Sequence, residues 1–472
     1  MTGRLLSGHE PLDMVLGGGL PANAISLIMG LPGTGKTIIA QQYVFRNARP
    51  DRPALYFSTV SEPLEKIVRF GQNLDFFDRS AVGSSVFYED LGSTLSTSGL
   101  AGVTEQITAA LRERRPGLIV IDSFKALHAF ADTGSEFRRF LHELAGRLSA
   151  FPASSLWVGE YEEAEAGSLA EFAVADAIMG LAAERVGQRE IRFLSVRKMR
   201  GSGYLSGRHA YRLSSSGLHL FPRLADLRID EAYHLDDARM SSGIPALDEM
   251  LAHGYWPGAS TLIAGPTGSG KTLLGLHFIL QGARQGEPGV IASLQENQTQ
   301  LERIARGFGW SVSEPGVEVM YRSPVDIYID EWVYELMQAV ERTGARRVLI
   351  DSLADLRLAA PDETRFREFI YSIVQRFSRQ GVGVMMTFEV PDLFRSERLS
   401  DAAVSHLSDN VVLLNYIHER DSIKRAVSVI KSRASYHEPD VRLFVISPDG
   451  IVLADSPAAE QGADRRAKRS VG

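Results

Sequence analysis

The 472-residue chain consists of two copies of one sequence unit. The segment SGHEPLDMVLGGGLPANAISLIMGLPGTGKT in the first half reappears as SGIPALDEMLAHGYWPGASTLIAGPTGSGKT in the second. Four landmarks recur in the same order and at nearly constant spacing: Asp13 and Asp248, Lys36 and Lys271, Asp122 and Asp351, Lys198 and Lys431. The repeat is far too long for a solenoid, so each copy is expected to be a whole domain.

The duplication predicts where the chain divides. We expect a first domain over residues 1–228, a linker over 229–240, a second domain over 241–455 and a tail over 456–472. The linker falls in a polar, acidic and weakly periodic stretch. The tail holds small and charged residues with little to bury, so we expect it to be disordered.

Within each copy, short β-branched runs such as AISLIM, LIVID and VLIDS alternate with amphipathic helical patterns. Apolar residues follow helical spacing in one segment of each copy: Phe137, Phe140, Leu141, Leu144 and Leu148, then Phe366, Phe369, Ile370, Ile373 and Phe377. Strands that alternate with helices indicate an α/β fold with a mostly parallel sheet flanked by helices on both faces.

Composition excludes several classes of protein. The chain contains no cysteine, which rules out disulfides, thiolate metal sites and a cysteine nucleophile. Its net charge is −7, which makes nucleic-acid binding an unfavoured function. No apolar run is long enough to span a bilayer, and acidic residues interrupt the N-terminal segment before a signal peptide could develop. We therefore expect a cytoplasmic protein with no membrane association.

Two phosphate-binding loops stand out. GLPGTGKT and GPTGSGKT both satisfy the pattern G-x-x-x-x-G-K-[ST], and each lies between an apolar strand and a helix. Glycines allow the backbone N–H groups to turn toward phosphate oxygens, and the lysine neutralises phosphate charge. The residues predicted to bind ATP are Gly30, Gly33, Thr34, Gly35, Lys36 and Thr37, and Gly265, Gly268, Ser269, Gly270, Lys271 and Thr272.

The same loops predict a magnesium site in each copy. The hydroxyls of Thr37 and Thr272 are of the type that binds Mg²⁺ beside a P-loop. Asp122 and Asp351 each end an apolar strand, where a carboxylate can hold the same ion. The alternative is that each aspartate caps the helix after it.

The combined motifs, with their tandem arrangement, resemble the KaiC family of RecA-like ATPases over nearly the whole chain. The resemblance implies two tandem RecA-like domains in a double-ring homo-hexamer with ATP bound at the subunit interfaces. It also implies ATP hydrolysis chiefly in the first domain, serine/threonine autophosphorylation in the second, and regulatory protein partners.

A basic K-x-R pair occurs late in each copy and corresponds to family residues that contact the neighbouring subunit's nucleotide. Here these residues are Lys198 and Arg200, and Lys431 and Arg433. Two cations spaced by two residues on a strand point to the same side, which suits a γ-phosphate reached from another subunit. The alternative is a solvated basic strand end.

The family carries adjacent glutamates after the strand that follows the P-loop helix. In the first copy Val60 and Ser61 occupy those positions, and Glu62 lies one step beyond. In the second copy the positions hold Gln295 and Glu296. Because valine cannot accept a proton, we expect hydrolysis to depend on Glu296, with Glu62 as the candidate base of the first copy.

The family's phosphoacceptors are a neighbouring serine and threonine. Ser405 keeps the serine, whereas His406 replaces the threonine, so Ser405 is the predicted phosphoacceptor. The long C-terminal partner-binding tail of the family is not matched by residues 456–472. A related signalling or stress ATPase is thus favoured over a three-component clock.

Two other functions stay open from the sequence: a RecA/RadA-type recombination ATPase that binds DNA, and a non-catalytic scaffold gated by nucleotide. A basic cluster, Arg112 to Arg115, lies near the end of an expected helix, and a favourable interaction with the helix dipole is its simplest explanation.

Overall fold

The computed structural model describes residues 3–60, 64–186, 189–224, 238–325, 327–360, 362–390, 406–419 and 422–454. The chain divides into two compact units, Met1–Leu227 (unit 1) and Arg228–Gly472 (unit 2). Most of the predicted linker and all of the predicted tail lie outside the described residues, so the boundaries proposed from the sequence stay predictions.

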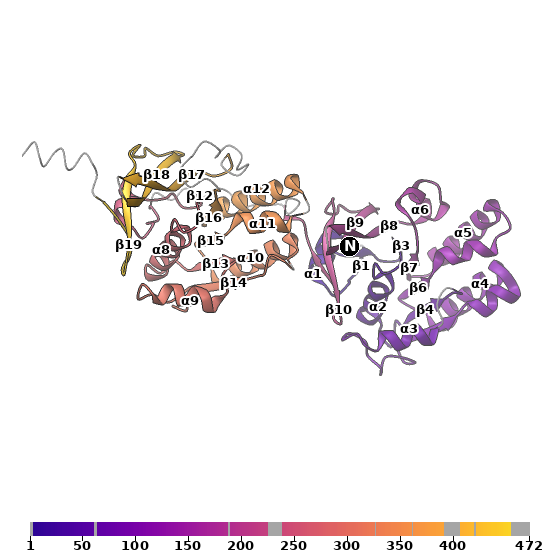
Figure 1. The fold of residues 1–472 in the computed structure, drawn as a ribbon. Helices are drawn as coiled ribbons and strands as arrows, with labels where there is room; N and C mark the ends of the chain where they lie inside the picture. The colour runs from indigo at the N-terminus through magenta and orange to yellow at the C-terminus, as the bar shows by residue number, and fades with distance from the viewer. Residues whose placement is uncertain are drawn as a thin grey trace, which may run out of the picture. The chain divides into compact units, whose positions relative to one another are not determined.

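Unit 1 contains a nine-stranded sheet in the order β11-β10-β9-β8-β3-β7-β6-β4-β5 (Figure 1). The parallel strands are β3 (Ile25–Gly30), β4 (Ala54–Ser58), β5 (Val86–Asp90), β6 (Leu118–Asp122), β7 (Ser154–Gly159) and β8 (Ala177–Val186). An antiparallel extension follows, with β9 (Arg189–Met199), β10 (His209–Ser214) and β11 (Gly217–Phe221). A separate two-stranded sheet pairs β1 (Arg4–Leu5) with β2 (Leu20–Pro21).

The helices of unit 1 are α1 (Glu10–Val15), α2 (Lys36–Asn47), α3 (Leu64–Gly71), α4 (Gly92–Arg114), α5 (Gly134–Ser149) and α6 (Ala170–Val174), with short 3₁₀ helices η1 (Phe124–Phe130) and η2 (Glu163–Gly167). Apolar side chains from α1 and α2 pack on one face of the sheet, and those from α4 and α5 pack on the other. All five apolar residues predicted along α5 are buried.

Unit 2 repeats this topology with the sheet order β14-β13-β15-β16-β12-β17-β18-β19-β20. Its strands are β12 (Ser260–Gly265), β13 (Gly289–Ser293), β14 (Val317–Tyr321), β15 (Arg347–Asp351), β16 (Gly383–Glu389), β17 (Asn410–Glu419), β18 (Ser422–Ser432), β19 (Arg442–Ser447) and β20 (Gly450–Leu453). Its helices are α7 (Pro245–Met250), α8 (Lys271–Arg284), α9 (Gln298–Arg306), α10 (Ile329–Thr343), α11 (Leu353–Ala359) and α12 (Glu363–Gln380). The predicted fold class, two tandem α/β domains with mostly parallel sheets flanked by helices, is confirmed.

The central strand of each sheet positions the P-loop that follows it. Every residue of β3 and of β12 is buried, because helices cover both faces of the sheet. Each central strand has parallel neighbours on both sides, β7 and β8 in unit 1 and β16 and β17 in unit 2. Ligands of open α/β sheets bind beyond the carboxyl ends of such strands, where each P-loop begins.

One matched pair of polar side chains ties the P-loop helix to the terminal hairpin in each unit. Gln42 of α2 accepts a hydrogen bond from the backbone N–H of Leu218 through Oε1 at 3.1 Å. His277, at the equivalent position of α8, accepts one from the N–H of Ile451 through Nε2 at 2.9 Å. Burial lowers the pKa of His277 to about 4, so this histidine is neutral at physiological pH.

Among the described residues, no helix combines the length and the apolar character that crossing a membrane requires.

Candidate functional site: two nucleotide sites

Each P-loop has the backbone shape that its glycines permit. Gly33 and Gly35 of unit 1 have φ of 78° and 88°, and Gly268 and Gly270 of unit 2 have φ of 74° and 103°. These left-handed values favour glycine, since a side chain would clash with the neighbouring backbone. The second glycine of each pair is the N-cap of the following helix, so the N-terminus of the helix points into the loop.

The first glycine of each loop is fixed by a close approach of a neighbouring strand. A Cβ on Gly30 would lie 2.4 Å from the carbonyl oxygen of Leu181, and one on Gly265 would lie 2.5 Å from that of Leu414. Both contacts come from the parallel strand beside the P-loop strand. The G-x-x-x-x-G spacing therefore reflects packing against the sheet as well as phosphate binding.

The P-loop lysines lie among backbone carbonyls of their own loops. Lys36 Nζ donates to the carbonyl of Leu31 at 2.9 Å. Lys271 Nζ donates to the carbonyls of Gly265 and Pro266 at 3.0 and 2.9 Å. Burial lowers the pKa of both ammonium groups, and nearby carboxylates partly offset this effect. A desolvated cation of this kind gains from an anionic ligand, which is what a phosphate would supply.

The predicted metal-binding residues come together in both units. Thr37 Oγ1 donates to Asp122 Oδ2 at 2.9 Å, and Thr272 Oγ1 donates to Asp351 Oδ2 at 2.6 Å. No cluster of three or more His, Cys, Asp or Glu suited to a metal is found in the described part of the chain. One carboxylate beside one hydroxyl nevertheless fits Mg²⁺, which takes few protein ligands and completes its shell with water and phosphate oxygens.

A further hydroxyl holds each aspartate in place. Tyr56 donates to Asp122 Oδ2 at 2.6 Å, and Thr387 donates to Asp351 Oδ1. Both donors come from neighbouring strands of the sheet, β4 and β16. The helix-cap alternative for the two aspartates is not what the geometry shows, because neither side chain caps the helix that follows.

Glu296 lies three residues beyond the end of β13, and its N–H donates to Ser293 Oγ at 3.1 Å. Its Oε2 is buried without a hydrogen-bond partner among the described residues. Burial raises the pKa of this carboxyl, and the negative charges of Asp351 and Asp355 raise it further. A carboxyl group with a raised pKa near Asp351, the predicted metal ligand, is suited to accepting a proton.

The corresponding segment of unit 1 differs. Val60, two residues beyond the end of β4, is 51% exposed. Glu62, the predicted base of this unit, lies outside the described residues. In unit 2 the other residue of the pair, Gln295, donates to Asp355 Oδ2 at 2.7 Å and so has a structural partner.

The structure adds two carboxylates that the sequence reasoning missed. Glu160 and Glu389 lie at the carboxyl ends of β7 and β16, beside the P-loop strands. Each favours the charged form of the P-loop lysine in its unit. Glu389 also accepts a hydrogen bond from Thr267 of the P-loop at 2.5 Å. The signal that could have found them is their matching place at the end of a buried strand in both copies.

Strands late in each unit also reach the P-loop. Tyr211 of β10 donates to the carbonyl of Thr34 at 2.6 Å. In unit 2 Tyr416 of β17 donates to the carbonyl of Thr267 at 3.3 Å, and Arg425 of β18 donates to that of Gly268 at 3.4 Å. These contacts are not visible in the sequence, because they join residues more than 140 positions apart.

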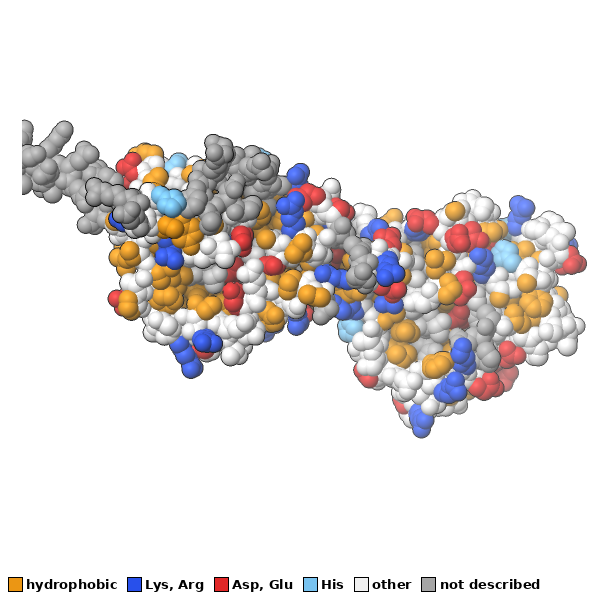
Figure 2. Space-filling model, in the orientation of Figure 1, with side chains coloured by type: hydrophobic (Ala, Val, Ile, Leu, Met, Phe, Trp, Pro, Cys, Tyr) orange, Lys and Arg blue, Asp and Glu red, His pale blue; other side chains and the backbone are white. Residues whose placement is uncertain are grey.

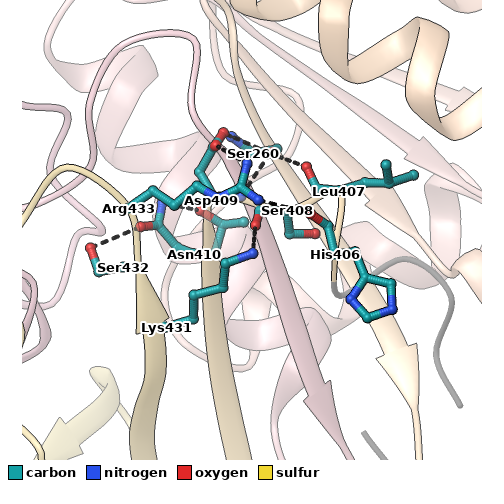
Figure 3. Close-up of polar contacts among 10 residues, drawn as sticks. Ser260, His406, Leu407, Ser408, Asp409, Asn410, Lys431, Ser432 and Arg433 are labelled. Atoms are coloured by element: carbon teal, nitrogen blue, oxygen red, sulfur yellow. Dashed lines mark hydrogen bonds and ion pairs between the residues drawn. The ribbon is translucent and has the colours of Figure 1, made fainter. Parts of the chain in front are cut away.

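Each K-x-R pair contacts its own unit, through helix α6 in unit 1 and through the loop before β17 in unit 2. Lys431 Nζ donates to the carbonyl of Ser408 at 2.6 Å, and Arg433 Nη2 donates to that of His406 at 3.2 Å (Figure 3). In unit 1 Lys198 Nζ donates to the carbonyls of Phe172 and Ala173 at 3.0 and 2.9 Å. The arginines also pair with aspartates: Arg200 with Asp176 at 3.2 Å and Arg433 with Asp409 at 3.8 Å.

Strand register places both pairs at the sheet edge opposite the P-loops. Asp176 and Asp409 accept hydrogen bonds from the N–H groups of Ile25 and Ser260, the first residues of the P-loop strands. Five residues separate these positions from Gly30 and Gly265, which is roughly 16 Å of strand. The structure therefore does not bring either K-x-R pair to the P-loop of its own unit.

The predicted phosphoacceptor Ser405 lies outside the described residues. The described chain resumes at His406, whose carbonyl holds Arg433, and continues through Asp409 into β17. The K-x-R pair of unit 2 is therefore bound to the loop that directly follows Ser405.

Comparison with known proteins gives a consistent match over both units. A family model described as "ATPase: KaiC" matches residues 6–225 and again residues 240–458. The circadian clock oscillator protein KaiC 1 of Synechocystis sp. is 27% identical over 465 residues, covering 95% of this chain and 88% of that protein. The KaiC proteins of Picosynechococcus sp. and Rippkaea orientalis are 26% and 27% identical, with 95% of this chain covered and 89% and 88% of theirs.

Proposed function

Because the chain belongs to the KaiC family of ATPases, we propose that both of its units bind Mg·ATP and that unit 2 carries most of the hydrolysis. The observation that supports binding is the duplicated set of P-loop lysine, threonine and strand-end aspartate, with the threonine–aspartate contact present in both units. The observation that supports the asymmetry is the buried carboxylate oxygen of Glu296, because the sequence positions of unit 1 that match Gln295 and Glu296 hold Val60 and Ser61.

In the proposed reaction the residues of unit 2 have separate tasks. The P-loop N–H groups and Lys271 bind the β- and γ-phosphates, and Thr272 and Asp351 hold the metal, which neutralises charge on the transferring phosphoryl group when bound. Glu296 takes the proton of the attacking water. Its raised pKa makes it a better proton acceptor than an ordinary surface glutamate.

We further propose that the K-x-R pairs act on the nucleotide of a neighbouring subunit in a homo-hexamer. Each pair lies at the edge of its sheet opposite the P-loop of its own unit. A ring of head-to-tail contacts would bring that edge to the P-loop edge of the next copy. Lys198, Arg200, Lys431 and Arg433 would then stabilise charge on the γ-phosphate in trans.

We also propose that the protein autophosphorylates Ser405. It is supported by family membership and by the position of Ser405 next to the loop that binds Lys431 and Arg433. With His406 in place of a second hydroxyl, one phosphate per chain is expected. The relatives are named as clock oscillator proteins, so we propose a cytoplasmic regulatory role with protein partners.

One alternative has a specific observation in its favour. Val60 cannot act as a base, so unit 1 could bind nucleotide to hold the assembly together without hydrolysing it. A DNA recombinase is less well supported, because on the face drawn in Figure 2 the Lys and Arg side chains of the described residues are interspersed with Asp and Glu.

The test is an ATPase assay and a mass measurement on the wild type, Lys36→Ala and Lys271→Ala. We expect Lys271→Ala to remove most phosphate release and Lys36→Ala to weaken nucleotide-dependent assembly. A monomeric mass at micromolar protein with saturating Mg·ATP would refute the hexamer. Equal loss of phosphate release in the two variants would refute the asymmetry.

A further inference from the structure

A cavity of about 560 Å³ lies in unit 1, away from the P-loop. It is lined by three arginines and an apolar floor: Arg52, Arg112 and Arg115 with Leu111, Pro116 and Phe151. These residues come from the turn before β4, the end of α4 and the turn before β7. All three segments lead into the amino ends of parallel strands, whereas the P-loop leaves the carboxyl end of β3. The cavity and the nucleotide site are therefore at opposite edges of one sheet.

The guanidinium groups of this cavity are available to a ligand. The side chains of Arg112 and Arg115 have no ion pair or hydrogen bond with any described residue. Arg52 donates one N–H to the carbonyl of Pro152 at 3.0 Å and keeps its other donors. Asp51 is the one carboxylate that lines the cavity within the described structure. The cavity thus has an excess of positive charge, in a form that binds phosphate through paired N–H groups.

Unit 2 shows that the fold itself does not require these arginines. In the matching positions of unit 2 the three residues Arg52, Arg112 and Arg115 are replaced by Glu287, Glu341 and Gly344. The alignment is set by the helix ends, since α4 and α10 both stop before a left-handed C-cap residue, with φ of 46° and 62°. In unit 1 that residue is an arginine, although the conformation favours glycine by about 1–2 kcal/mol.

A helix-dipole role explains only part of the basic cluster at the end of α4. Arg114 has its own partners, because it pairs with Glu89 at 3.6 Å and lies over the ring of Phe87 at 4.0 Å. Arg112 and Arg115 instead turn to the cavity. Their presence is therefore better explained by a ligand than by the helix they end.

We propose that this cavity binds a small organic phosphate at a second anion site, independent of the two P-loops. The phosphate group is held by Arg52, Arg112 and Arg115, and the apolar body of the ligand packs on Leu111, Pro116 and Phe151. The volume lies within the usual range of small-molecule sites, and the apolar floor with a few convergent charges is their usual composition.

The probe for this site is 1-naphthyl phosphate, which combines a phosphate with an aromatic body. Calorimetric titration of the full chain should show one saturable site that Arg112→Glu weakens at least 10-fold. The matched control is Arg139→Glu, because Arg139 is also an exposed helical arginine of unit 1 and its replacement changes the charge equally. We expect the control to bind the probe within 2-fold of the wild type. Saturating Mg·ADP in every titration keeps the P-loops occupied, so that the probe reports the proposed site alone.

A second variant distinguishes loss of probe binding from a folding defect. Arg115→Gly places the residue of unit 2 in a conformation that suits glycine, so it should weaken probe binding without lowering the thermal midpoint of unfolding. Equal binding by the wild type and Arg112→Glu would overturn the proposal, as would an equal loss in Arg139→Glu. Binding of an octaglutamate peptide, with no binding of 1-naphthyl phosphate, would indicate an acidic protein partner and would also overturn it.

Discussion

Replacement of Glu296 by glutamine tests whether unit 2 is the catalytic unit. Glutamine keeps the size and hydrogen-bonding character of the side chain but cannot accept the proton of the attacking water. A positioned general base contributes about 10²–10⁴-fold, so we expect kcat for ATP hydrolysis to fall at least about 100-fold, or about 2.7 kcal/mol of barrier. The affinity for Mg·ATP should stay within about 2-fold, because Lys271 and Thr272 are unchanged.

The same substitution should raise the stability of the folded protein although it lowers the activity. The folded protein raises the pKa of Glu296, so the folded state holds a proton there more tightly than the unfolded state does. The ionised carboxylate therefore costs stability at neutral pH, and this cost disappears as the pH falls below the ordinary glutamate pKa. Glu296→Gln should then unfold at a higher temperature than the wild type at pH 7, with the difference lost in acid.

The assay is steady-state phosphate release from pH 5 to 8, with thermal unfolding of the same proteins. Wild-type activity should fall on the acid side as Glu296 gains a proton, and the variant should lose this limb. Glu62→Gln is the matched comparison in unit 1, and we expect a smaller loss of kcat. If Glu62→Gln is the more damaging change, unit 1 is the motor and the reasoning is wrong.

Further predictions concern the metal, the subunit interface, the phosphosite and acid stability. Asp351→Asn should raise the Mg²⁺ concentration needed for half-maximal turnover about 10-fold, measured by metal titration; an unchanged requirement would argue against a metal role. Arg433→Ala should lower kcat while unit 2 still binds nucleotide, measured by turnover and by binding of a fluorescent ATP analogue. Incubation with Mg·ATP should add one phosphate by intact mass, absent in Ser405→Ala; no added mass in the wild type would leave only the ATPase. His277 has a folded pKa of about 4, so unit 2 should lose of order 3 kcal/mol of stability as the pH falls from about 6.5 toward 4, and His277→Gln should unfold with less acid sensitivity by circular dichroism.

The sequence was sufficient for the fold and for the residues that follow fixed spacing along one strand or loop. The P-loop pattern places Thr37 and Thr272 at the first turn of a helix, just beyond the carboxyl end of a strand. In a parallel sheet, an aspartate at the end of another strand lies at this same edge of the sheet. The observed Thr37–Asp122 and Thr272–Asp351 contacts follow from these two facts.

The sequence was insufficient where the site depends on which strands are neighbours. Glu160 and Glu389 act on the P-loop lysines because β7 and β16 lie next to the P-loop strands, and this order is not visible in a linear pattern. The opposite-edge position of the K-x-R pairs likewise requires the antiparallel register of β9 and β18. The roles predicted for Glu62 and Ser405 lie outside the described residues and stay predictions.

The central claim is that the catalytic site of unit 2 is completed by the K-x-R pair of another copy. Mixing Lys271→Ala with Arg433→Ala tests it most directly, after subunit exchange in Mg·ADP. In a ring with random mixing, about one interface in four joins an intact P-loop to an intact arginine. The mixture should therefore recover roughly a quarter of the turnover of unit 2, which is the turnover that Glu296→Gln removes from the wild type. A mixture no more active than the average of the two variants alone would contradict the claim.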